Sequence, residues 1–160
     1  MNKGKGWGYG KWTRIDTKMF TSKAFLSLSA TSVKVLILFL GKRRLIFPKD
    51  RKGNKGVMVC ENSNELTMTY KELGNKPFNF TRPRITRAID ELLAKGFITI
   101  VDPGGAYDKH KAVYALSDLW QQWKPGTKPF NKRIRDINRG FQGQGKGVLQ
   151  TSKEKNFQHT

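Results

Sequence analysis

The residues best suited to recognition chemistry stand together at the start of one helical pattern, TRPRITRAIDELLAKG. Three arginines precede Asp90 and Glu91 in this stretch. The N-terminus of a helix carries partial positive charge, so arginines there oppose the helix dipole and need a negative partner. Arginine pairs bidentately with the O6 and N7 atoms of guanine, and threonine also contacts base edges. A surface that reads the major groove of DNA is therefore predicted at Arg82, Arg84, Thr86 and Arg87.

A plainer interpretation of the same charges is an ordinary solvated helix. Arg87 would then pair with Asp90 or Glu91 about one turn later. Such a pair is worth only about 0.2–0.5 kcal/mol on an exposed helix. At about 100° per residue, Arg84 and Arg87 point away from the apolar face under either interpretation, so the sequence leaves both open.

Catalytic chemistry is not indicated. The two histidines, His110 and His159, are far apart in sequence, and Cys60 is the single cysteine. No Ser-His-Asp set, paired carboxylate motif or cluster of metal ligands is present. We therefore expect no enzymatic activity, no metal and no cofactor.

The elements that must hold the arginines follow from periodicity. Ile85, Ile89, Leu92 and Leu93 recur at the spacing of one buried helical face. Residues 97–101 and 112–116 are rich in β-branched and aromatic side chains. The loop between them contains Pro103, Gly104 and Gly105, which favour a turn. The expected order is helix, strand, loop, strand.

An earlier helix is predicted to be the central buried one. Ser29 or Thr31 is a suitable N-cap, and the apolar spacing that follows places Val33, Leu36, Ile37 and Leu40 on one face. Gly41 ends the pattern. The basic triplet that comes next suits the negative end of the helix dipole, and the alternative is a contact to the nucleic-acid backbone. The triplet consists of Lys42, Arg43 and Arg44.

A short strand at 64–68 and a second short helix precede the arginine-rich one. Thr69 and Glu72 match a capping box, in which each side chain satisfies a backbone amide at the helix start. The connection at 74–80 carries Lys76 and is longer than the three or four residues of the simplest helix-turn-helix. Between the central helix and this region, 45–63 reads as two short apolar runs flanking a basic turn.

The segment RAIDELLAKGFITI resembles the recognition helix and following strand of winged helix-turn-helix domains, above all those of small bacterial, phage and plasmid proteins. The resemblance covers residues 18–123 and implies an α+β fold in which helices carry a small antiparallel hairpin, the wing. The wing loop would place Lys109, His110 and Lys111 near a groove or a phosphate. Asp102 and Asp108 oppose these cations, so the predicted wing is only mildly basic.

Three regions are predicted. Residues 1–17 form a basic arm of alternating glycine and aromatic residues, 18–123 form the winged-helix domain, and 124–160 form a basic tail of low complexity. Trp120 and Trp123 are expected to close the base of the core. The arm's aromatic side chains either stack on bases or pack on the domain.

The charge favours an anionic partner. The 160 residues have a net charge of +19, from 31 Lys and Arg against 12 Asp and Glu. Such an excess favours nucleic acid, and the arginine pattern favours double-stranded DNA. The expected role is transcription regulation or replication initiation, in the cytoplasm and associated with the nucleoid. No apolar run approaches the about 18 residues that a membrane span needs.

The sequence leaves two alternatives to a double-stranded DNA-binding protein. The arm and the tail suit an RNA-binding or ribonucleoprotein-associated protein, since RNA recognition uses stacking and segments that order on binding. A winged helix can also serve as a protein interaction module. A reader of palindromic DNA would be expected to form a homodimer, although no coiled-coil segment guarantees one.

Overall fold

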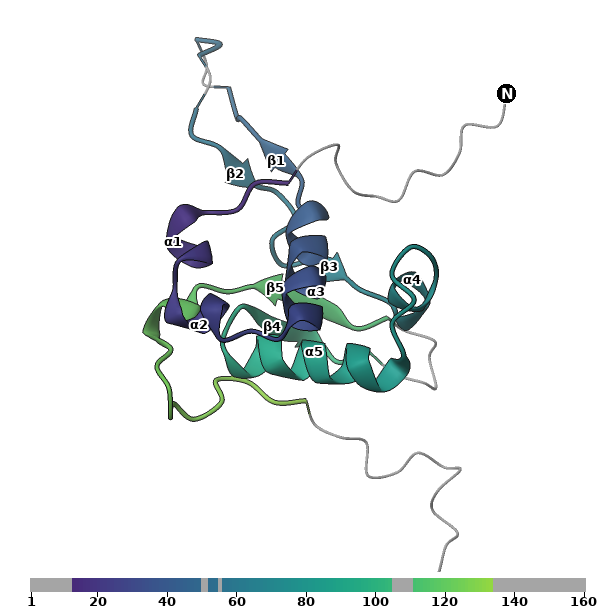
Figure 1. Ribbon diagram of the computed structural model, residues 1–160. Helices are drawn as coiled ribbons and strands as arrows, with labels where there is room; N and C mark the ends of the chain where they lie inside the picture. Colours follow the sequence, from purple (N-terminus) through teal and green to yellow (C-terminus); the bar gives the residue numbers. More distant parts are fainter. Residues whose placement is uncertain (1–12, 50–51, 55, 105–110, 134–160) are drawn as a thin grey trace, which may run out of the picture.

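The computed structural model in Figure 1 describes residues 13–49, 52–54, 56–104 and 111–133. These residues form an α+β fold with antiparallel sheets. The α-helices are α1 Thr17–Phe20, α2 Lys23–Leu26, α3 Ala30–Gly41, α4 Tyr70–Gly74 and α5 Arg82–Ala94, and a 3₁₀ helix, η1, spans Leu119–Gln122. The strands are β1 Leu45–Ile46, β2 Val59–Cys60, β3 Leu66–Thr67, β4 Ile98–Asp102 and β5 Val113–Leu116.

The helix boundaries follow local capping chemistry. Ser29 is the N-cap of α3 and its hydroxyl accepts from the Ser32 amide, as predicted. The capping box of α4 is also confirmed, because Thr69 and Glu72 each accept a backbone amide of the other. α5 ends at Ala94 with Lys95 as its C-cap, and the next residue is Gly96, whose φ of +77° suits glycine. A Cβ at this position would lie 2.6 Å from Leu119 Cβ, so the close approach also requires glycine.

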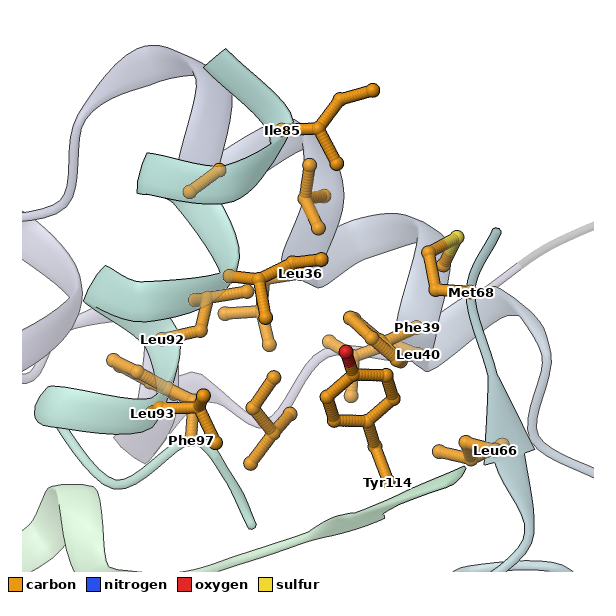
Figure 2. Packing of buried hydrophobic residues seen from close by; sticks show 14 of the residues in the cluster. Leu36, Phe39, Leu40, Leu66, Met68, Ile85, Leu92, Leu93, Phe97 and Tyr114 are labelled. Carbon is orange, nitrogen blue, oxygen red and sulfur yellow. The ribbon is translucent and has the colours of Figure 1, made fainter. Parts of the chain in front are cut away.

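α3 and α5 pack against each other over the sheet and form the core (Figure 2). The predicted inner face of α5 is confirmed, because Ile85, Ile89, Leu92 and Leu93 are all buried. The predicted face of α3 was partly wrong. Leu36 and Leu40 are buried, but Val33 and Ile37 are only half-buried. The remaining buried side chains of α3 are Ser32, Val35 and Phe39.

The strands form two separate sheets. β3, β5 and β4 are neighbours in that order, and all pairs are antiparallel. The hairpin predicted at 97–101 and 112–116 is confirmed as β4 and β5. The pairing of β1 with β2 confirms strands in the 45–63 segment, and this hairpin projects away from the core (Figure 1).

The chain after η1 turns back along α5 (Figure 1). The Phe130 amide donates to the Ala94 carbonyl at 3.1 Å, and a Cβ on Gly96 would lie 2.9 Å from the Phe130 ring. Residues 124–133, which we call the strap, were predicted as the beginning of the tail. The strap has no periodic pattern because single contacts, rather than a buried face, hold it to the domain.

Candidate nucleic-acid interface

The three arginines of α5 are exposed and have no counter-ion within residues 13–49, 52–54, 56–104 and 111–133. Arg82, Arg84 and Arg87 all lie in the first two turns, and Arg84 and Arg87 point away from the buried face. None of them forms an ion pair or side-chain hydrogen bond with any residue in the part of the chain that the structure describes. The alternative in which Arg87 pairs with Asp90 or Glu91 is therefore not what the structure contains.

The acidic residues of α5 have other partners. Lys95 Nζ lies 2.7 Å from Glu91 Oε1, and Ser32 Oγ donates to Glu91 Oε2 at 2.6 Å. Burial raises the pKa of Glu91, but hydrogen bonds from Lys95, Ser32 and Ser29 lower it more, so the pKa falls below its ordinary value. Both carboxylates of α5 are thus engaged away from the arginines, since Asp90 binds the strap.

Arg133 fastens the strap across α5 and α4. Its Nε lies 2.7 Å from Asp90 Oδ1, and its two terminal nitrogens donate to the Thr86 carbonyl at 2.9 Å and to the Tyr70 hydroxyl at 3.1 Å. Burial lowers the pKa of the Arg133 guanidinium, but the hydrogen bonds to Asp90 and Tyr70 raise it above its ordinary value. Arg133 therefore holds the two helices of the candidate interface in one arrangement.

Thr86 lies at the centre of this contact. Its side chain is half-buried, and its hydroxyl is 3.0 Å from the Tyr70 hydroxyl. Tyr70 is the first residue of α4, and 38% of its surface is exposed to solvent. Sequence analysis missed Tyr70 and Arg133, because neither belongs to a motif and their partners are far away in sequence. The signal available for Tyr70 was its place directly after the predicted N-cap.

The structure places two further predicted cations at the surface. Lys76 is exposed in the connection that leads from α4 into α5. Lys111 is exposed just before β5. Lys109 and His110, the other predicted wing residues, lie outside the described residues. Their contact with nucleic acid stays a prediction.

Lys42 is engaged inside the fold. Its Nζ donates to the Thr67 carbonyl at 2.6 Å and to Glu72 Oε1 at 2.7 Å, and its side chain is only 14% exposed. Burial raises the pKa of Glu72, but the hydrogen bonds from Lys42 and Thr69 have the larger effect. The pKa therefore lies below its ordinary value. The Lys42 charge thus joins α3, β3 and α4.

Arg43 and Arg44 also have partners within the chain. Arg43 Nε donates to the Leu40 carbonyl at 3.0 Å, and another of its nitrogens donates to the Arg14 carbonyl. Burial lowers the pKa of Arg43. Arg44 remains exposed. Its Nε lies 3.6 Å from Glu61 Oε2, and one of its terminal nitrogens lies 4.0 Å from Glu65 Oε2. Of the triplet Lys42, Arg43 and Arg44, only Arg44 has an exposed side chain.

The resulting surface presents exposed cations, whose chemistry suits phosphates and base edges. Within the described residues, no three His, Cys, Asp or Glu side chains are close enough to hold a metal ion. No helix in that part of the chain is long and apolar enough to cross a membrane. No protein-family model, curated protein or solved structure matches this chain.

Proposed function

We propose that this protein binds double-stranded DNA, with α5 in the major groove and the β4–β5 loop on the backbone. The observation that carries the proposal is the group of three exposed arginines at the start of α5, which have no counter-ion among the residues that the structure describes. Free arginines oppose the helix dipole there, and a DNA strand supplies the missing negative charge. The biological role would be transcription regulation or replication initiation.

The arrangement of elements supports the proposal that residues 18–123 form a winged helix-turn-helix. α3, β3, α4, α5 and the β4–β5 hairpin follow one another in that order, and β3 adds to the hairpin as a third strand. α4 and α5 are the two helices joined by a turn. α3 covers the apolar face of α5, which leaves the arginine face outward.

The test is binding of the full chain to duplex DNA, single-stranded DNA and duplex RNA of equal length, measured by fluorescence anisotropy across a salt series. We expect duplex DNA to bind most tightly, with log Kd rising steeply with log salt concentration. Each arginine that pairs bidentately with guanine contributes about 1–3 kcal/mol. Arg84→Ala/Arg87→Ala should therefore weaken binding to a selected site at least about thirtyfold.

Two control variants separate base reading from charge. Arg84→Lys/Arg87→Lys keeps both charges but removes the bidentate fork, so it should retain affinity for random duplex and lose preference for the selected site. Lys34→Ala/Lys128→Ala removes two exposed charges elsewhere and should have a small effect. If single strands or RNA bind best, or if the alanine pair matches this control, α5 does not read DNA. The RNA-binding and protein-interaction alternatives would then take precedence.

A further inference from the structure

A hollow whose lining differs in chemistry from the arginine surface lies at the other end of the molecule from the start of α5, where α1, α2 and η1 meet (Figure 1). Its volume is about 380 Å³, within the range of small-ligand pockets. Two indole side chains and three lysines from separate segments converge on it. The lining residues are Lys18, Ser22, Lys23, Trp120, Gln121, Trp123 and Lys124.

The lysines around this hollow are not neutralised. Lys18, Lys23 and Lys124 are exposed, and none forms an ion pair with any described residue. The nearest carboxylates in sequence, Asp16 and Asp118, do not line the hollow. Three like charges at one site repel each other, so an anion bound among them would lower the electrostatic free energy.

The two tryptophans differ in what they offer. Trp120 is 5% exposed and stacks on Phe97 with ring centroids 6.1 Å apart, so it forms the rigid base of the hollow. Its indole N–H is buried and has no hydrogen-bond partner in the described structure. Trp123 is half-buried, and Lys95 Nζ lies 5.3 Å from its ring. Trp123 is the more exposed of the two rings, and a base would stack on the face that Lys95 does not cover.

We infer that this hollow binds a nucleotide unit, with the base against Trp123 and the phosphate among the three lysines. Stacking on an aromatic side chain contributes about 1–3 kcal/mol per base and accepts any base. The unit could come from a free mononucleotide or from an unpaired nucleotide of a single strand, and the chemistry is shared. The residues outside the described ranges at either end of the chain are poor occupants because both segments are net basic.

The test uses the full chain and three probes: adenosine monophosphate, a single-stranded thymidine dodecamer and inorganic tripolyphosphate. Binding is measured by calorimetry. Lys18→Ala/Lys23→Ala/Lys124→Ala should weaken dodecamer binding at least about tenfold. A matched triple variant at exposed lysines elsewhere, Lys34→Ala/Lys49→Ala/Lys128→Ala, should weaken it less than threefold.

Aromatic recognition is tested with Trp123. Trp123→Ala should lower dodecamer affinity at least about fivefold, and Trp123→Phe should restore most of it, because an aromatic face remains. Near-ultraviolet circular dichroism checks that Trp120 keeps its packing in each variant. Comparison of the monophosphate with the dodecamer distinguishes a free ligand from a single strand.

Three outcomes would overturn the inference. Equal losses in the two lysine triples would mean that only total charge matters. Equal affinity for tripolyphosphate and the dodecamer would mean an anion site without base recognition, and unchanged binding in Trp123→Ala would exclude stacking. The result is independent of the proposed duplex function, because Arg84→Ala/Arg87→Ala should leave dodecamer binding at the hollow intact.

Discussion

Two basic triplets, one after α3 and one at the start of α5, look alike in sequence and differ in what their charges contact. Lys42 and Arg43 donate to carbonyl and carboxylate oxygens inside the fold, and Arg44 faces two glutamates. Arg82, Arg84 and Arg87 meet no carboxylate in the described structure. A count of charges therefore does not predict which of them are free to bind a ligand.

The difference has a simple electrostatic origin. The first triplet follows the C-terminus of α3, where the helix dipole already favours cations, so its charges can take part in folding. The second triplet is placed where the dipole disfavours it. Charges that weaken the isolated fold are best explained by a partner that binds them, which is why the α5 arginines carry the proposal.

Removing one long cation from each triplet tests whether the two triplets have different roles. Lys42→Met should lower the free energy of unfolding by about 2–3 kcal/mol, because Glu72 loses its charged partner in a partly buried site. Arg84→Met should change it by less than about 0.5 kcal/mol. Urea denaturation followed by circular dichroism measures both. Equal losses would mean that Arg84 also has a structural role.

Arg133 tests whether the candidate interface depends on the strap. Arg133→Ala removes three contacts, and we expect the free energy of unfolding to fall by about 1–2 kcal/mol, reduced from the buried value by partial exposure. Duplex affinity should also fall, since Tyr70 and Thr86 lose their fixed positions. Lys132→Ala is the control, because the Lys132 side chain is exposed. A variant that loses stability and keeps full affinity would show that the strap serves the fold alone.

Acid should weaken the fold through two glutamates. The pKa values of Glu72 and Glu91 are lowered in the folded state, so each carboxylate stabilises the fold above its unfolded pKa, and that stability is lost as pH falls. We expect the urea midpoint to decrease from about pH 4.5 downward. Glu91→Gln should be less stable at pH 7 and should show a shallower decrease. An unchanged pH profile in this variant would contradict the assignment.

The salt dependence of DNA binding should change by the least. If Arg82 contacts a phosphate, Arg82→Ala should reduce the slope of log K against log salt by about one. Lys42→Met should leave the slope unchanged, because its ammonium group is held inside the fold. The measurement is the anisotropy series repeated at four salt concentrations. A reduced slope for Lys42→Met would place its charge on the DNA instead.

Much of the fold could be predicted because the signals were local. Helix caps at Ser29 and Thr69, the apolar face of α5 and its glycine end all depend on residues within a few positions of each other. The face of α3 could not be read correctly, because its sequence is apolar nearly all around. The elements that pack on α3 decide that Val35 and Phe39 point inward, and the Phe39 ring lies 5.4 Å from the Tyr114 ring of β5, centroid to centroid.

The candidate site was predictable only in part for a similar reason. The arginines of α5 were identified from type and spacing. The partners that decide which cations are available are distant in sequence: Glu72 lies 30 residues from Lys42, and Asp90 lies 43 residues from Arg133. The strap carries no periodic pattern, so nothing local indicates that it returns to α5.

Glu91 also has a consequence for how the domain folds. Its carboxylate accepts from the Ser29 amide at 3.2 Å and from the Ser32 hydroxyl, so a side chain of α5 completes the cap of α3 from 62 residues away. A peptide containing only α3 keeps the Ser29 cap but lacks the contacts of Glu91, so its first turn would fray more. The end of one helix becomes stable only when the other has docked, which makes the two helices a single cooperative unit.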